Sequence, residues 1–97
     1  MVVKWSKSSV KQFIEILSFL EAQEQFKYAE RLEQEILKTI ILLSSNPSIF
    51  QIDRLKQDND GSFYAFEIDS FRISFRKLPK EIRILRIRHT SRRPYQK

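Results

Sequence analysis

The spacing of apolar residues changes once along this chain of 97 residues, from a helical period to a strand period. Between residues 10 and 43, apolar side chains recur every three or four positions, which is the spacing of amphipathic helices. Between residues 63 and 89, apolar and polar side chains mostly alternate, which is typical of strands that have one covered face. Helices followed by strands predict a fold of the α+β class.

Two helices are predicted in the first half of the chain. The first covers residues 7–22 after an N-cap at Ser6, and the second covers residues 26–43. Leu37 and Ile41 widen the apolar face of the second helix beyond a single stripe. The few residues between the two helices predict an αα-hairpin.

Strands are predicted on both sides of the helical hairpin. A short strand over residues 2–5 comes before it, and strands over residues 63–68, 71–76 and 82–89 follow it. Short connections between the last three strands predict an antiparallel meander. The alternation breaks at Ile84-Leu85, where either both faces are partly covered or a β-bulge shifts the phase. The order β-α-α-β-β-β therefore predicts an αα-hairpin packed on one face of a small antiparallel sheet.

The length and composition limit the classes of protein to which the chain can belong. We expect one domain over residues 1–97, with a basic tail over residues 90–97. The chain has no cysteine and a single histidine, His89, so we expect no disulfide, no metal site and no cofactor. No apolar run approaches the roughly 20 residues of a membrane helix, and the first nine residues lack the apolar segment of a secretion signal. We therefore expect a cytoplasmic protein that does not associate with a membrane.

Positive charge is concentrated in the last quarter of the chain. Residues 1–70 hold 8 Lys and Arg against 11 Asp and Glu, whereas residues 71–97 hold 10 Lys and Arg against one acid, Glu81. Such an asymmetry favours a polyanionic or acidic partner for the C-terminal part. The alternative explanation is that the charge only keeps a small domain soluble.

Arginines of the last two strands are expected to form a basic patch on the open side of the sheet. Arg72 and Arg76 alternate with apolar neighbours, and Arg86 and Arg88 share one face of the next strand if no bulge intervenes. Arginine binds carboxylate and phosphate groups with two parallel hydrogen bonds. The alternative is that these charges protect exposed strands from aggregation. The candidate residues for binding a partner or a nucleic acid are Arg72, Arg76, Arg86, Arg88, Arg92 and Arg93.

Four segments, in this order, match a known pattern. They are Val3-Lys4-Trp5-Ser6 before the first helix, Leu43 with Asn46-Pro47 after the second helix, Phe71-Arg72-Ile73-Ser74-Phe75, and the closing run from Ile82 through Ile84-Leu85-Arg86-Ile87-Arg88-His89 to Pro94. Together they resemble the RelE/ParE superfamily of bacterial toxins from type II toxin–antitoxin modules. The closing run is similar to the ParE-like branch.

The resemblance implies both a fold and a function. The fold is an αα-hairpin on a small twisted antiparallel sheet, which agrees with the order of elements predicted from the spacing. The function is that of a growth-inhibiting, plasmid-stabilising toxin that a cognate antitoxin neutralises. The cellular target implied is either DNA gyrase or the ribosome with its messenger RNA. Binding of operator DNA by the toxin–antitoxin complex, through the antitoxin, is also implied.

The branch of the superfamily that cleaves messenger RNA needs a base, an acid and several cations around the phosphate. If the chain were such a nuclease, the candidate catalytic residues would be Arg72, His89, Arg92 and Tyr95. Arg72 matches the strand arginine that ribosome-dependent members place near the phosphate. Those members also carry lysines on the preceding strand, whereas residues 63–67 here contain no lysine and end at Glu67. A lone histidine such as His89 also has a purely structural explanation, as a packed or hydrogen-bonding side chain.

Three functions from different classes are therefore open. We favour a ParE-like toxin that binds a target and an antitoxin, and the alternative is a RelE-type endoribonuclease that cuts messenger RNA on the ribosome. A simple nucleic-acid-binding module is the third, although no known reading motif is present. We expect an amphipathic antitoxin segment to place its acids near the arginines and its apolar face on surface that Phe63 and Ala65 contribute.

Overall fold

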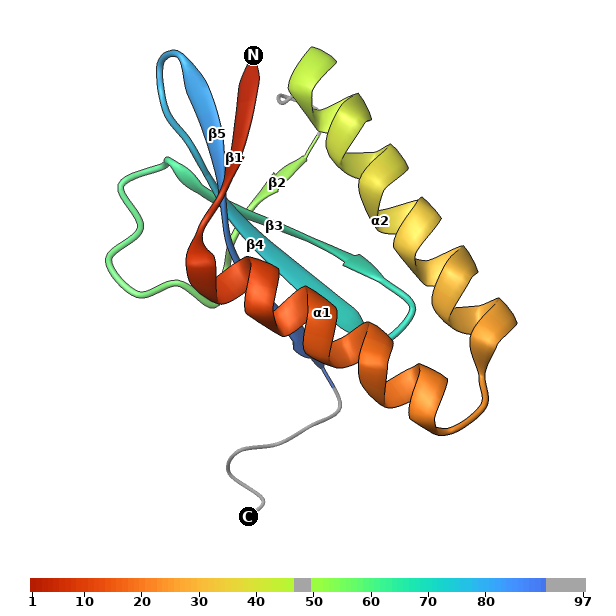
Figure 1. Ribbon diagram of the computed structural model, residues 1–97. Coiled ribbons are helices and arrows are strands. Elements are labelled where there is room, and N and C mark those ends of the chain that lie inside the picture. Colours follow the sequence, from red (N-terminus) through yellow and green to blue (C-terminus); the bar gives the residue numbers. More distant parts are fainter. Residues whose placement is uncertain (47–49, 91–97) are drawn as a thin grey trace.

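The computed structural model describes residues 1–46 and 50–90, and Figure 1 shows its arrangement of helices and strands. The described residues form the elements β1 (Val2–Trp5), α1 (Lys7–Ala22), α2 (Phe26–Ser45), β2 (Gln51–Ile52), β3 (Phe63–Ile68), β4 (Phe71–Lys77) and β5 (Glu81–His89). Both predicted helices and all four predicted strands are confirmed, and β2 is an additional short strand. In this part of the chain, no helix is long and apolar enough to cross a membrane.

The helical hairpin begins at a capped N-terminus and turns sharply between its two helices. Ser6 has extended backbone angles, and its Oγ accepts a hydrogen bond from the backbone N–H of Ser9 at 3.0 Å. This confirms the predicted N-cap. Between the helices, Glu24 adopts a left-handed φ of 59°, which reverses the chain within a few residues. The αα-hairpin is therefore confirmed.

The strands form one sheet in the order β1-β5-β4-β3-β2. The pairs β2–β3, β3–β4 and β4–β5 are antiparallel, as predicted for the meander, whereas β1 pairs with β5 in parallel. The sheet is thus mixed rather than wholly antiparallel. Parallel neighbours need a long connection between them, and the helical hairpin together with the other strands supplies it.

A β-bulge lies in β5 at the point where the alternation of the sequence breaks. Ser74 pairs with Arg86 and the next residue of β4, Phe75, pairs with Ile84, so Leu85 is the extra residue of the bulge. Of the two explanations left open by the sequence, the shift of phase is therefore the correct one. Because of this shift, Ile84 and Ile87 face the same side of the sheet although they are three positions apart.

Both helices pack on one face of the sheet, as Figure 1 shows and as the sequence predicts. Phe75 of β4 lies within this core, and the ring centroids of Phe50, Tyr64 and Phe66 lie between 5.5 and 6.2 Å from its own. The large side chains that are fully buried are Leu32, Ile36 and Leu43 of α2, Ile73 and Phe75 of β4, and Ile82, Ile84 and Ile87 of β5. Neither α1 nor α2 covers the opposite face of the sheet.

The N-cap of α1 and one polar side chain within the helix hydrogen-bond the outer edge of β5. β1 ends at Trp5, so the second half of β5 has no neighbouring strand on that side. Ser6 Oγ donates a hydrogen bond to the Leu85 carbonyl at 3.1 Å, and Gln12 Oε1 accepts one from the Ile87 N–H at 2.8 Å. These contacts satisfy backbone groups of β5 that would otherwise be unpaired, because no strand lies beside them. They also fix α1 beside the second half of β5.

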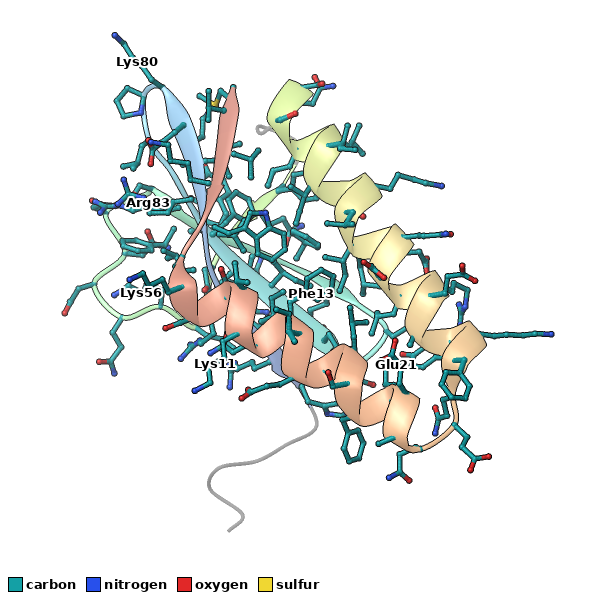
Figure 2. All side chains as sticks on the ribbon, viewed as in Figure 1. Lys11, Phe13, Glu21, Lys56, Lys80 and Arg83 are labelled. Carbon is teal, nitrogen blue, oxygen red and sulfur yellow. The ribbon has the colours of Figure 1, made fainter. Side chains whose placement is uncertain are left out.

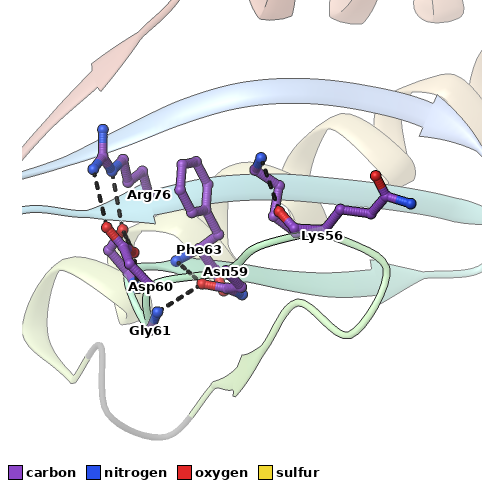
Figure 3. Close-up of polar contacts among 8 residues, drawn as sticks. Lys56, Asn59, Asp60, Gly61, Phe63 and Arg76 are labelled. Atoms are coloured by element: carbon purple, nitrogen blue, oxygen red, sulfur yellow. Dashed lines mark hydrogen bonds and ion pairs between the residues drawn. The ribbon is translucent and has the colours of Figure 1, made fainter.

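One asparagine organises the connection between β2 and β3. The Nδ2 of Asn59 donates hydrogen bonds to the carbonyls of Asp53 and Phe63 at 3.1 and 2.9 Å. Its Oδ1 accepts hydrogen bonds from the N–H groups of Gly61 and Phe63 at 2.8 and 3.2 Å. Figure 3 shows these two accepted bonds. Gly61 has a φ of 95°, a conformation that side chains with a Cβ rarely adopt. The amide group thus holds both ends of the connection together.

We predict that Asn59→Ala lowers the free energy of unfolding by about 1–3 kcal/mol, because four backbone groups lose their side-chain partner. Urea unfolding followed by circular dichroism measures this change. The matched control is Asn46→Ala, because the cap at the end of α2 uses the Asn46 backbone N–H and not its side chain. The control is expected to change stability by less than about 0.5 kcal/mol. Equal effects of the two substitutions would contradict the assignment.

Candidate functional site

The pairing of β4 and β5 gathers the predicted arginines on the face of the sheet that the helices leave open. Arg72 lies directly opposite Arg88, and Arg76 lies opposite Arg83. Arg86 lies opposite Ser74, on the same face as Arg88. Because the bulge precedes Arg86, the two arginines at the end of β5 keep a common face with those of β4. Arg83 was not among the predicted residues, although the alternation of β5 would have included it.

Arg72 is held by two carboxylates. Its Nη2 donates to Asp53 Oδ1 at 2.5 Å, and its Nη1 donates to Glu67 Oε2 at 2.9 Å. Only 13% of the Arg72 side chain and 10% of the Asp53 side chain are exposed. Asp53 Oδ1 also accepts the backbone N–H of Leu55 at 2.9 Å, so this carboxylate is fixed from two sides. A phosphate could reach the Arg72 guanidinium only by displacing these partners.

Arg76 lies in a second cluster, which covers Phe63. The Arg76 guanidinium carbon lies 4.8 Å from the centroid of the Phe63 ring, and Lys56 Nζ lies 4.7 Å from it. Arg76 Nε donates to Ser62 Oγ at 3.0 Å, and its Nη2 lies 3.5 Å from Asp60 Oδ2 (Figure 3). The Phe63 ring is therefore packed against two cations. It does not offer the apolar docking surface that the sequence suggested.

The carboxylates near these arginines are stabilised in their charged form. Hydrogen bonds donated by the Ser62 hydroxyl and backbone N–H lower the pKa of Asp60 below its usual value. The hydrogen bond donated by Arg83, together with its charge, likewise lowers the pKa of Glu81. Both carboxylates are consequently ionised at neutral pH, and they offset the charges of Arg76 and Arg83.

Two arginines at the end of β5 have no such partner. Among the described residues, Arg86 and Arg88 have no carboxylate within ion-pair distance, and the buried Nε of Arg88 makes no hydrogen bond. Arg88 also faces Arg72 across the strand pair, where two like charges repel. On the open face, the positive charge that no described carboxylate offsets therefore lies in the second half of β5.

His89 lies on the other side of the sheet from Arg72. It pairs with the buried Phe71, and the His89 and Phe71 rings meet edge to face with centroids 5.0 Å apart. The helix-facing side of β5 thus carries His89, which lines a groove of about 650 Å³ together with Gln12 and Phe19 of α1. Contrary to the expectation for a nuclease, the fold does not bring Arg72 and His89 together on one face.

The remaining candidates, Arg92, Arg93 and Tyr95, lie outside the described residues. Within residues 1–46 and 50–90, no group of three or more histidine, aspartate or glutamate side chains is placed to hold a metal ion.

A second surface, on the helical hairpin, is apolar and exposed. We define the apolar hairpin surface by the flank residues Val10 and Ile14 of α1 and Leu37 and Ile41 of α2. Ile14 and Ile41 are 57% and 68% exposed. In the sequence, the unusually wide apolar face at Leu37 and Ile41 was the signal of this surface.

The two flanks of the apolar hairpin surface both border β1. Val10 and Ile14 line a hollow of about 440 Å³ with Trp5, the last residue of β1. Leu37 and Ile41 lie seven and three positions before Ser44, which places the three on one side of α2. The Ser44 carbonyl accepts a hydrogen bond from the Met1 amino group at 3.1 Å, just before β1. Figure 1 shows α1 and α2 diverging from the hairpin turn towards the end of the molecule at which β1 begins.

Comparisons with known proteins agree with this architecture. A structure titled as the chromosomal ParDE toxin–antitoxin system from P. aeruginosa matches with a TM-score of 0.72 and 22% identity, covering 92% of this chain and 95% of the other. The toxin–antitoxin complex RelBE2 from Mycobacterium tuberculosis matches with a TM-score of 0.53 and 15% identity, covering 91% and 95%. A conserved hypothetical protein from Helicobacter pylori matches with a TM-score of 0.51 and 20% identity, covering 94% and 96%. At these identities the likeness is one of fold.

The sequence itself identifies the family. A search of curated protein sequences finds no match. The model of a protein family, described as the ParE toxin of the type II toxin–antitoxin system parDE, matches residues 3–94. This match spans nearly the whole chain and includes both the open sheet face and the helical hairpin. The chain therefore belongs to the family of ParE toxins of type II toxin–antitoxin systems.

Proposed function

We propose that this ParE family toxin inhibits growth in the cytoplasm by binding a protein target, DNA gyrase, and that it does not cleave RNA. The observation that carries the proposal is the position of Arg72, whose guanidinium is bound to Asp53 and Glu67. Cations that stabilise a phosphorane must be available to it and fixed close together. Arg72 is not available in this way, and His89 lies on the opposite face of the sheet.

The arrangement instead gives Arg72 a structural role. Asp53 is almost buried and belongs to the connection between β2 and β3, so its ion pair with Arg72 attaches this connection to the centre of the sheet. An intact buried ion pair contributes little to the free energy of unfolding. Removal of one partner, in contrast, leaves an unpaired buried charge and lowers the free energy of unfolding strongly. The stability of the protein should therefore depend on Arg72.

We predict that Arg72→Ala lowers the free energy of unfolding by about 3 kcal/mol, because it leaves the Asp53 carboxylate buried without its cation. The control is Arg86→Ala, which removes an exposed arginine of the same face and should cost less than about 0.5 kcal/mol. Urea unfolding of both variants measures the difference. A stable Arg72→Ala protein that has lost only its toxicity would instead favour a functional role for this side chain.

The cellular target is tested by two assays on the active toxin. We predict that purified toxin inhibits supercoiling by DNA gyrase and that its induction produces no codon-positioned cuts in messenger RNA, as measured by primer extension. Cuts that disappear in His89→Ala would show that the chain is a ribosome-dependent nuclease. Neither cuts nor inhibition of supercoiling would exclude both targets.

We also propose that the antitoxin docks on the apolar hairpin surface. An amphipathic helix can lay its apolar face on the exposed side chains of the apolar hairpin surface. Lys7 and Lys11 line the same hollow as Val10 and Ile14, so acidic residues at the rim of such a helix would meet opposite charge. In the toxin–antitoxin complex, the antitoxin would then bind the operator DNA, as the resemblance to the RelE/ParE superfamily implies.

We predict that the double variant Ile14→Asp/Ile41→Asp weakens antitoxin binding by about 100-fold or more, because docking would bury two unpaired carboxylates. Copurification of untagged antitoxin with tagged toxin measures the loss. The matched control is Phe26→Asp/Leu55→Asp, which adds the same charge at two residues that are more than 60% exposed and lie outside the surface. Loss of the antitoxin from both variants would contradict the proposed site.

A further inference from the structure

The groove beside the end of β5 has apolar walls, and we call it the β5 groove. It has a volume of about 650 Å³, and it lies between α1, the start of β4 and the end of β5. Ile16 and Leu20 line it from α1, and Phe71 and Ile87 line it from the sheet. Phe19 also lines it and is 63% exposed, so the groove is open to solvent on this side. It therefore offers apolar surface to a ligand without enclosing it.

Hydrogen bonds hold the elements around the β5 groove in place. Gln12 of α1 accepts a hydrogen bond from the backbone of β5 at 2.8 Å. Tyr28 of α2 donates one to Asp69, in the turn between β3 and β4, at 2.8 Å. The next residue of this turn, Ser70, accepts a hydrogen bond from the backbone N–H of Thr90 at 2.6 Å. The groove is therefore preformed, and a preformed site loses less free energy to ordering when it binds a ligand.

The β5 side of the groove carries positive charge that no described carboxylate offsets. Arg88 lines the groove and makes no ion pair with a described residue. Arg86 is exposed on the same strand, and it likewise has no ion pair within the described part of the chain. A carboxylate bound at Arg88 would offset this charge. On the α1 side, the exposed acid Glu15 lines the groove, so the two sides differ in charge.

The β5 groove and the apolar hairpin surface lie on different flanks of α1. Phe19 follows Val10 by nine positions, which is about two and a half turns of a helix, so the two side chains leave the helix on opposite sides. Trp5, which lines the hollow beside Val10, stacks on Phe13 with ring centroids 5.4 Å apart. Figure 2 shows Phe13 on the side of α1 that faces α2. A ligand in the β5 groove would therefore leave Val10 and Ile14 accessible to the antitoxin.

The open shape, the apolar walls and the opposite charges of the two sides together favour a peptide as the ligand. Small molecules are usually bound in hollows that bury most of their surface, whereas the β5 groove is open along Phe19. The repeated phosphates of a nucleic acid would meet Glu15 as well as Arg88. A peptide can instead place large apolar side chains against the walls and a single carboxylate at Arg88. Aromatic residues and arginine are also enriched among the contacts that carry protein–protein affinity.

We propose that the β5 groove binds an acidic peptide segment of a partner protein, with apolar side chains of the segment against the walls and a carboxylate at Arg88. The stretch of α1 from Gln12 to Phe19 is about 10 Å long at 1.5 Å per residue, which matches about three residues of an extended peptide. The inference goes beyond the proposed function, because binding of this segment requires neither gyrase nor the apolar hairpin surface.

The test begins with the selection of short peptides from a random library displayed on phage. The bait is the full chain carrying Ile14→Asp/Ile41→Asp, so that the apolar hairpin surface cannot capture them. We expect the selected peptides to combine large apolar residues with at least one acid. Fluorescence anisotropy then measures the affinity of a labelled selected peptide for the toxin and its variants.

We expect Phe19→Asp to weaken binding of this peptide by about tenfold or more, as truncation of an aromatic hot spot does. The matched control is Phe26→Asp, which adds the same charge at a phenylalanine that is 61% exposed and does not line the groove. The control should leave the affinity nearly unchanged.

The charge at the β5 side is tested separately. We expect Arg88→Gln to weaken binding by about tenfold, because the peptide loses a hydrogen bond between charged groups. The matched control is Arg54→Gln, which removes the same charge from an exposed position in the connection between β2 and β3. If circular dichroism shows that Arg88 is needed for folding, Arg86→Gln replaces it, with an expected loss of about threefold for an exposed pair.

Several outcomes would overturn the proposal. Equal losses in a variant and its matched control would mean that the groove is not the site, and selected peptides without acids would exclude an acidic partner. Equal competition by single-stranded DNA at the same charge concentration would assign the groove to a nucleic acid. Antitoxin copurification and gyrase inhibition are measured on Phe19→Asp as well, and we expect the antitoxin to be retained. Its loss would make the groove part of the antitoxin site, whereas failed peptide binding with both activities intact would reject this inference alone.

Discussion

One extra residue in β5, Leu85, decides which side chains of that strand face the helices and which face away from them. A shift of one position along a strand moves every side chain to the other face. The bulge makes this shift between Ile84 and Arg86. It keeps the isoleucines of β5 in the core on both sides of the break, and it leaves Arg86 and Arg88 on the open face. The core and the basic surface therefore depend on the same local irregularity.

The positions of a few acidic residues then divide the open face into a neutralised part and a positive part. Asp53 reaches Arg72 because Asn59 closes the connection between β2 and β3, and Asp60 reaches Arg76 through the same connection. One face of one sheet consequently has a neutralised centre and a positive end. The arginine that most resembles a catalytic residue lies in the neutralised part, which favours a binding protein over a nuclease.

The helical hairpin shows a similar division between stability and binding. Its inner stripe is buried against the sheet, whereas the flanks that border β1 leave large aliphatic side chains exposed. Exposed apolar surface on both helices is typical of a protein that acts with a partner. This agrees with membership of a family of toxins that operate in toxin–antitoxin pairs. The open face of the sheet and the apolar hairpin surface lie on different sides of the molecule, so each can bind a partner of its own chemistry.

The sequence by itself determined both helices, the N-cap at Ser6, the strands of the meander, the break at Ile84-Leu85 and the family, because each of these is encoded in local spacing or in short motifs. Only the tertiary structure decided the parallel pairing of β1, the separation of Arg72 from His89, and the carboxylate partners of Arg72 and Arg76. Asp53 and Arg72 are 19 positions apart, and no periodicity relates a loop acid to a strand arginine. Such pairings arise from the three-dimensional path of the connection between the strands, which the spacing of apolar residues does not specify.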